Sequence, residues 1–318
     1  MSPPARVLWI PPVEEPSNEA DVARLAAGLS LPRPLARLLI RRGFGDVAAA
    51  QDFLDPRLQR LADPFALPDM AAAVARIFGA IDRREPITLY GDYDVDGVTS
   101  LTLLAEVLTG YGATPACFLP HRMDEGYGLS ADGVARCVAE HQPKLLIAVD
   151  CGTVSADEIA SLKASGVDTI VLDHHEPGAV RPDCVALVNP KCDPDGACKY
   201  LCSAGIVFKT CHALLKTRPQ PGYDLKSALD LVALGTVADL VPLKGENRVL
   251  VRRGLVELAR TPRPGLRALM DVSGLGRGTM RPGDVGFRLG PRLNAAGRLG
   301  TAQAALELLQ TRDSRRAR

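Results

Sequence analysis

The chain has 318 residues, of which 47% are hydrophobic and 4% aromatic, and its formal net charge is +1. Such a composition is normal for a globular protein with a sizeable core, and the length accommodates one large or two ordinary domains. The near-zero net charge gives no global sign of a nucleic-acid binder, although it is compatible with a local basic patch. The low aromatic content argues against a large stacking surface. No apolar stretch reaches the length of a membrane span, and the N-terminus lacks the apolar core of a signal peptide, so we predict a cytoplasmic protein that does not contact membranes.

The N-terminal part, residues 1–85, predicts a helical lead-in that packs on the α/β unit after it. Apolar positions recur at helical spacing, and Asp46 is placed to cap a helix. The predicted helices are 20–29, 34–42, 48–54 and 70–83.

Residues 86–243 alternate short apolar runs with amphipathic stretches, which predicts a parallel sheet with helices on both faces. The expected strands are 87–90, 116–119, 145–149, 169–172 and 185–188. The expected helices are 98–108, 130–140, 156–165, 203–216 and 225–237.

The C-terminal part predicts a change of architecture. Residues 244–284 are expected to form two helices and then a glycine-rich linker that starts at Ser273. Residues 285–318 are expected to begin a second, smaller α/β domain, with a glycine-containing turn around 292–298 and a helix over 302–318. Because that helix has no closing cap or partner, we expect the sequence to be truncated inside this domain.

Eight cysteines raise the question of a metal site. In an intracellular chain of this size they are expected to be reduced. The run Cys192, Cys198 and Cys202 invites a zinc interpretation, but its spacing differs from the short paired spacing of structural zinc sites. Ordinary packing cysteines are therefore the favoured interpretation.

Acids and histidines follow three of the predicted strands at the point where each strand ends. Asp94 and Asp96 follow the first strand, Asp150 follows the third, and the run 173–175 (Asp-His-His) follows the fourth. The carboxyl ends of parallel strands meet at one edge of a sheet, where sites form in open α/β folds. Carboxylate and imidazole together suit a divalent metal. At any one strand, the alternative interpretation is a solvated acidic turn whose aspartates cap a helix. To explain the whole pattern, such a turn would have to occur by coincidence after three strands.

A further acid, Asp239, ends an apolar helix just before a proline. An ordinary helix-terminal acid is the simple interpretation. A negative charge near a helix C-terminus is mildly unfavourable, however, so a cation partner would rationalise its position.

These segments resemble known motifs. The stretches 91–97, 150–152, 173–175 and 235–239 are similar to the four motifs of the DHH phosphoesterase superfamily. The loop 120–129 and the stretch 292–298 narrow the resemblance to the RecJ branch, which consists of single-strand-specific 5′→3′ DNA exonucleases. The resemblance extends over nearly the whole chain and implies a parallel-sheet α/β catalytic domain.

By this resemblance, five residues would hold two divalent ions, Mn²⁺ or Mg²⁺, with Asp150 as the bridging carboxylate. His175 would assist catalysis near the scissile phosphate, and Asp92 and Asp173 would be auxiliary groups beside it. Many superfamily members carry a metal-binding histidine where this chain has Tyr90, which implies weaker binding of the first ion. The five expected ligands are Asp94, Asp96, Asp150, His174 and Asp239.

The resemblance also implies contacts to the DNA backbone or its 5′ end by Arg122, Arg292 and Arg298. Two arginines and Asn294 in a glycine-containing turn suit phosphate binding by side chains and backbone N–H groups. The alternative for each arginine is a surface salt bridge.

The implied activity is two-metal hydrolysis of single-stranded DNA from the 5′ end, in DNA repair and recombination, in which two ions activate a water and neutralise the attacking and leaving oxygens. A monomer is expected, with a single-strand-binding protein or a helicase as candidate partners. Two alternatives remain open. One is a phosphoesterase of the same superfamily that acts on short oligonucleotides, cyclic dinucleotides or nucleotide phosphates. The other is a catalytically silent scaffold.

Overall fold

The computed structural model describes residues 18–318 except 121–127, 194, 197, 277 and 300–301, with the side chains of 297–299 also left out. The chain divides after Arg57 into two compact units. Among the described residues no single helix is long and apolar enough to cross a membrane, whereas one bent pair, Leu58–Ala66 with Met70–Arg83, meets the length and composition criteria together.

The first unit consists of three short helices around a small apolar core. They are α1 (Glu19–Leu29), α2 (Arg33–Arg41) and α3 (Val47–Leu54). The Asp46 carboxylate accepts a hydrogen bond from the Ala49 N–H at 2.9 Å, so the predicted cap of α3 is confirmed. The core residues are Val22, Leu25, Ala36, Leu39 and Ala50.

The second unit is built on a five-stranded sheet in which each neighbouring pair is parallel. The strand order is β2-β1-β3-β4-β5. The chain runs from β1 to its neighbour β2 on one side and then crosses back to β3 on the other side of β1. This reversal makes the β1/β3 boundary the point where a crevice opens at the carboxyl edge. The strands are β1 (Ile87–Gly91), β2 (Ala116–Phe118), β3 (Leu145–Val149), β4 (Asp168–Leu172) and β5 (Ala186–Val188).

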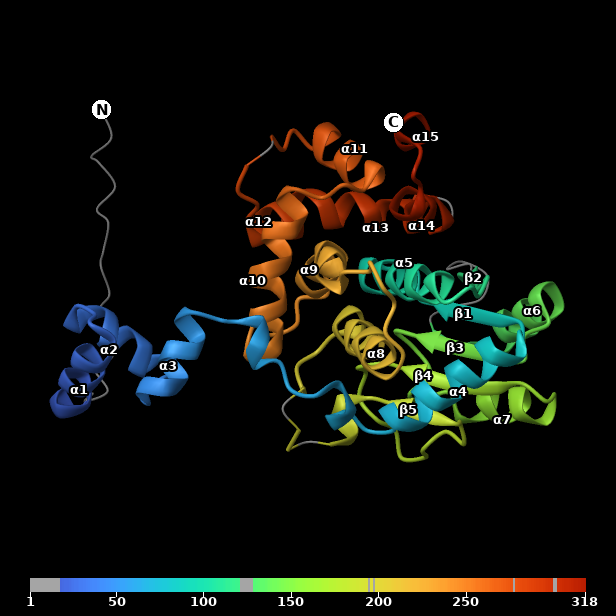
Figure 1. The fold of residues 1–318 in the computed structure, drawn as a ribbon, viewed down its shortest axis with the longest axis horizontal. Helices are drawn as coiled ribbons and strands as arrows, with labels where there is room; N and C mark the ends of the chain where they lie inside the picture. The colour runs from blue at the N-terminus through green and yellow to red at the C-terminus, as the bar shows by residue number, and fades with distance from the viewer. Residues whose placement is uncertain (1–17, 121–127, 194, 197, 277, 300–301) are drawn as a thin grey trace, which may run out of the picture. The chain divides into compact units, whose positions relative to one another are not determined.

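Helices cover both faces of this sheet, as predicted (Figure 1). Successive strand residues alternate between faces, so Leu89 and Ile147 belong to a different core cluster from Tyr90 and Leu146. The first cluster includes residues of α4 (Met70–Arg83), α5 (Val95–Gly110) and α8 (Ser203–Thr217). The second includes residues of α6 (Ala131–His141) and α7 (Ala156–Ala164).

The remaining secondary-structure elements of the described residues are helical. Four 3₁₀ turns are η1 (Leu58–Arg60), η2 (Pro64–Ala66), η3 (Pro190–Cys192) and η4 (Leu225–Ala228). The α-helices are α9 (Leu229–Ala238), α10 (Gly245–Ala259), α11 (Pro264–Val272), α12 (Pro282–Asp284), α13 (Gly290–Leu299), α14 (Gln303–Gln310) and α15 (Ser314–Ala317), with the π-helical turn η5 (Val285–Leu289) before α13.

Two predictions about the C-terminal part are wrong. The stretch 292–298 is not a turn but part of helix α13, because the helical run that begins with η5 at Val285 continues through it. The single helix expected over 302–318 is broken after Gln310, where Thr311 is extended and Asp313 caps the separate helix α15 by accepting from the Arg315 N–H.

Candidate metal centre

Four segments that are distant in sequence bring acids and histidines together at the carboxyl edge of the sheet. Asp92 and Asp94 follow β1, Asp150 follows β3, the run 173–175 follows β4, and Asp239 caps the C-terminus of α9. Among the described residues, three overlapping groups have candidate ligand atoms within 4.8 Å of one another. The groups are Asp92–Asp94–Asp150, Asp96–His174–Asp239 and Asp150–His174–His175.

The first group flanks the crevice between β1 and β3. Asp94 is the N-cap of α5, where its carboxylate accepts from the Gly97 N–H at 3.0 Å. Asp150 has a left-handed backbone (φ 64°), which is unusual for a residue other than glycine, while its N–H continues the pairing to the Leu172 carbonyl at 3.0 Å. Strain of this kind is tolerated where the surroundings fix the conformation, and here it turns the carboxylate toward the cluster.

The second group is centred on the His174 ring. Its Nε2 atom lies 3.4 Å from Asp150 Oδ1, 3.5 Å from Asp239 Oδ2 and 3.9 Å from Asp96 Oδ2. Both His174 Nε2 and Asp239 Oδ2 are buried without a hydrogen-bond partner. An unpaired buried polar atom is costly, and two of them 3.5 Å apart are suited to share a cation. The residues present therefore fit a divalent metal.

The start of α8 holds two of these carboxylates. Asp96 accepts hydrogen bonds from the backbone N–H groups of Ser203 at 2.7 Å and Ala204 at 2.9 Å, and the Ser203 hydroxyl donates to Asp150 Oδ1 at 2.8 Å. The unpaired N–H groups and dipole of a helix N-terminus favour negative charge. Sequence reasoning missed Ser203, because only the tertiary approach of α8 to α5 brings it to the site.

The carboxylates lie close enough to perturb one another. Burial, together with the charges of Asp239 and Asp94, raises the pKa of Asp96 to about 8. Burial and the neighbouring carboxylates also raise the pKa of Asp150, and burial and Asp94 raise the pKa of Asp239 to about 6. A bound cation would relieve this repulsion.

The His174 ring is neutral near pH 7, because burial and the charges of His175 and Lys191 lower its pKa to about 4. A neutral imidazole is the form that binds a metal.

Asp173 organises the backbone and side chain of the two histidines. Its carboxylate accepts from the N–H groups of Thr153 at 3.0 Å, His174 at 2.7 Å and His175 at 3.2 Å, and it lies 2.7 Å from Nδ1 of the His175 ring. Burial opposes the charge on Asp173, but the His175 and Thr153 hydrogen bonds lower its pKa, and the same contact to Asp173 raises the pKa of His175. The His175 ring is thereby fixed in orientation at the edge of the cluster.

Asn189 supports this arrangement from the end of β5. Its amide nitrogen donates to Thr153 Oγ1 and to the His175 carbonyl, each at 2.9 Å. Sequence reasoning did not select Asn189, although its position directly after a predicted strand is the same signal that identified the acids.

Tyr90 lies outside the metal cluster. Its ring packs beside Phe118 with 5.0 Å between centroids, and its hydroxyl donates to the Gly128 carbonyl at 3.2 Å. The ring belongs to the core cluster formed with α6 and α7.

The residues expected to contact phosphate do not lie together in one described site. Asn294 on α13 contacts the backbone of α5 between Asp94 and Asp96, because its Oδ1 accepts from the Val95 N–H at 3.1 Å. Arg292 is exposed, and its Nη1 donates to the Arg288 carbonyl at 2.7 Å. Two residues apart on a helix, Arg292 and Asn294 lie on different faces. Arg122 and the side chain of Arg298 lie outside the described residues.

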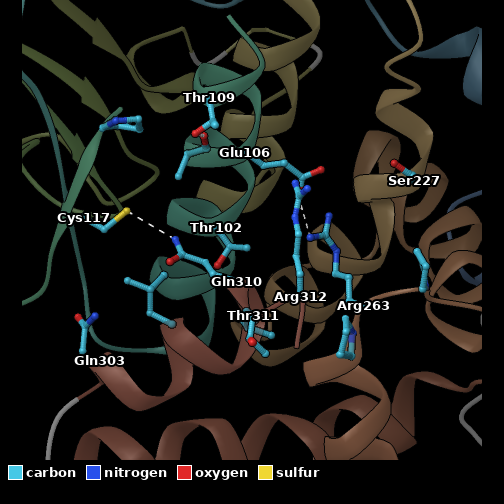
Figure 2. A pocket seen from close by; sticks show the side chains of 16 residues that line it. Thr102, Glu106, Thr109, Cys117, Ser227, Arg263, Gln303, Gln310, Thr311 and Arg312 are labelled. Carbon is cyan, nitrogen blue, oxygen red and sulfur yellow. Dashed lines mark hydrogen bonds and ion pairs between the residues drawn. The ribbon is translucent and has the colours of Figure 1, made fainter. Parts of the chain in front are cut away.

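A cavity of about 590 Å³ between α5, α11 and α14 shares no lining residue with the cluster (Figure 2). Within it Arg263 pairs with Glu106 at 2.7 Å, and the Gln310 amide donates to Cys117 Sγ at 3.6 Å. Because none of the metal-cluster residues lines this cavity, it does not extend the acidic site.

Known proteins share this fold and these motifs. Residues 86–236 match the DHH family, N-terminal domain. The chain is 40% identical over 306 residues to the single-stranded-DNA-specific exonuclease RecJ of Bacillus subtilis (strain 168). The aligned region covers 95% of this chain and 38% of that protein. It is 36% identical over 312 residues to the RecJ exonuclease of Thermus thermophilus, covering 98% of this chain and 43% of that protein.

Solved structures of RecJ proteins also match this chain. A crystal structure of exonuclease RecJ bound to manganese matches with a TM-score of 0.72 at 37% identity, over 79% of this chain and 63% of that one. RecJ from Thermus thermophilus in complex with Mn²⁺ matches with a TM-score of 0.80 at 33% identity, over 98% of this chain and 43% of that one. This chain thus spans about half or less of the length of the two curated relatives. With their motifs gathered at the strand ends of a matching fold, residues 86–236 of this chain belong to the DHH family as its N-terminal domain.

Proposed function

We propose that this chain hydrolyses phosphodiester bonds of single-stranded DNA from the 5′ end in a reaction that needs two divalent metal ions. The observation that carries the proposal is the cluster around His174 Nε2 and Asp239 Oδ2, two buried atoms without hydrogen-bond partners among converging carboxylates. The names of the RecJ relatives, and solved RecJ structures in complex with Mn²⁺ and Mg²⁺, support both the substrate and the metal.

We assign the two ions to the five ligands selected from the sequence. Asp150 is proposed as the bridging carboxylate, because it is the one acid that belongs to a group with Asp94 and also to a group with His174. Asp92 also has a ligand atom within 4.8 Å of Asp94 and Asp150, which makes it a further ligand candidate. When bound, two such ions activate a water and neutralise charge on the attacking and leaving oxygens.

The chain's own residues would position the reaction. Asp173 fixes the His175 ring through Nδ1, which directs Nε2 as the atom that exchanges a proton with the substrate. Ser203 orients Asp150, and the start of α8 holds Asp96. Asn294 anchors α13 against the first turn of α5. Arg292 and Arg298 keep their proposed contacts to the DNA backbone. Arg122 keeps its proposed role at the DNA end.

Other parts of the proposal rest on the resemblance to RecJ proteins. These are a cytoplasmic location, a monomeric state, a role in DNA repair and recombination, and cooperation with a single-strand-binding protein or a helicase. A phosphoesterase acting on short oligonucleotides or cyclic dinucleotides is the second candidate, because the first four motifs do not distinguish these substrates.

The test uses single-stranded DNA labelled at the 5′ or the 3′ end, with and without Mn²⁺, beside an Asp150→Ala control. Release of 5′ mononucleotides that requires both Mn²⁺ and Asp150 is the expected result. Turnover of dinucleotides but not of long single strands would favour the second candidate, and Mn²⁺ binding without cleavage of either substrate would overturn both.

A further inference from the structure

A second cavity, of about 410 Å³, opens directly beside the metal cluster. His174 and Glu176, from the segment after β4, form part of its wall, and the rest comes from the segment after β5 and the segment after α9. Its volume lies within the range of roughly 300–1,000 Å³ that is typical of small-molecule sites. Any group that occupies this cavity is therefore next to a proposed metal ligand.

The walls of the cavity combine one aromatic ring with aliphatic surface. Tyr200 lines it and is 37% exposed, while Leu201, Val241 and Pro242 supply the apolar remainder. Tyr200 is held through its backbone, because its carbonyl accepts a hydrogen bond from the Asn247 side chain. An exposed ring on a fixed backbone beside aliphatic groups is suited to a flat, partly apolar ligand such as a nucleobase.

Two ammonium groups border the same cavity. Lys191 pairs with Glu176 at 2.8 Å, but the Glu176 side chain is 82% exposed, so the pair is screened and readily exchanged for another anion. The Lys199 Nζ atom lies 5.4 Å from the centroid of the Tyr200 ring and makes no ion pair with the described residues. A ligand with both a flat ring and negative charge matches this set.

We propose that this cavity is a nucleotide subsite of the exonuclease, in which Tyr200 stacks on a base of single-stranded DNA while Lys191 and Lys199 bind the flanking phosphates. The inference rests on the proposed function, since the metal cluster beside the cavity fixes where the scissile phosphate lies. Base stacking tolerates any sequence because every base has a π-face, which suits an enzyme that must degrade any single strand.

The experiment measures binding rather than turnover. Single-stranded oligonucleotides with phosphorothioate linkages, which resist hydrolysis, carry 2-aminopurine at one of the first positions from the 5′ end. Their fluorescence and their Kd are measured with Ca²⁺ for the wild type, Tyr200→Ala and Tyr200→Phe. Phe65→Ala is the matched control, since Phe65 is 38% exposed, has Lys216 Nζ 5.9 Å from its ring centroid and does not line this cavity.

For stacking we expect quenching of 2-aminopurine at one position in the wild type and in Tyr200→Phe, and its loss in Tyr200→Ala. The Kd of Tyr200→Ala should rise roughly 5- to 150-fold, and an abasic residue at the same position should remove the difference between the two proteins. Lys191→Gln and Lys199→Gln should each weaken binding to all sequences and reduce the salt dependence by about one phosphate contact.

Equal Kd and equal quenching for Tyr200→Ala and wild type would overturn the subsite. This outcome is separable from failure of the proposed function. Cleavage of DNA without any dependence on Tyr200 would overturn only the subsite, whereas Tyr200-dependent stacking in a chain that does not cleave DNA with Mn²⁺ would overturn only the exonuclease.

Discussion

A single methyl group added at Gly235 should disturb the metal centre through its packing against Asp96 and the neighbours of Asp96. It lies within α9, and a Cβ built there would meet Thr99 Oγ1 at 2.6 Å, Asp96 Oδ1 at 2.7 Å and the Ala204 Cβ at 2.8 Å. None of these three groups can move away easily to make room for a Cβ. Thr99 Oγ1 is hydrogen-bonded to the Val95 carbonyl, Asp96 is held by the start of α8, and Ala204 belongs to α8 itself.

Two effects of Gly235→Ala oppose each other. Alanine is better than glycine in a helix by about 1 kcal/mol. Overpacking a fixed environment costs about 1–3 kcal/mol and occasionally more, and three contacts below 3.0 Å place this site at the upper end. We therefore expect the free energy of unfolding to fall by about 2 kcal/mol. The displaced Asp96 carboxylate should weaken Mn²⁺ binding about 10- to 100-fold, as loss of a group that orients a ligand does.

The assay combines urea unfolding without metal with calorimetric titration of Mn²⁺. Gly286→Ala is the matched control, since Gly286 also packs on α9 but a Cβ there would lie 3.8 Å from Val237, an ordinary contact. The control should bind Mn²⁺ like the wild type. Unchanged stability together with Mn²⁺ affinity within twofold of wild type in Gly235→Ala would refute the packing argument.

Three further predictions concern the same centre. Ser203→Ala removes the hydroxyl that donates to Asp150 Oδ1 and should weaken Mn²⁺ binding about 10- to 100-fold, seen by calorimetry, with only about 1 kcal/mol lost from unfolding. Asp173→Asn removes the negative charge beside His175 Nδ1 and replaces one accepting oxygen with a donating NH2 group, so it should lower kcat for DNA cleavage by about 10²- to 10⁴-fold; a change confined to KM would contradict the positioning role. Without metal, the raised pKa of Asp96, about 8 in the folded chain against an ordinary value of 3.8, means that its protonated form favours the folded state. The stabilising contribution of Asp96 is complete below about pH 4 and is lost as the pH rises toward 8. The gain in Tm on adding Mn²⁺ should therefore be larger at pH 8 than at pH 6. An equal gain at both pH values would refute the assignment.

The sequence alone predicted the edge where the site lies, for a simple physical reason. Apolar runs mark parallel strands, parallel strands share a carboxyl edge, and side chains just beyond that edge must meet. Asp94, Asp150 and His174 follow from this rule, and Asp239 was found because an acid at a helix C-terminus lacks a favourable partner. The same rule applied to β5 would have added Asn189.

The rest depended on tertiary packing that no local pattern encodes. Ser203 reaches Asp150 only because the start of α8 packs against α5. The helix α13 was mistaken for a turn because glycine is a local turn signal, whereas the helical run that begins at Val285 continues through Gly297. Tyr90 packs in the core cluster formed with α6 and α7, because successive residues of β1 point to opposite faces of the sheet and Leu89 faces the other cluster.

The central claim is that the cluster binds two divalent ions that share Asp150. It is tested most directly by the stoichiometry of Mn²⁺ binding to the wild type and to Asp150→Asn, measured by calorimetry and by electron paramagnetic resonance of the bound ions. We predict two ions per wild-type chain with magnetic coupling between them, and loss of the coupling and of at least one ion in Asp150→Asn. One uncoupled ion in the wild type, or two ions retained in Asp150→Asn, would contradict the account.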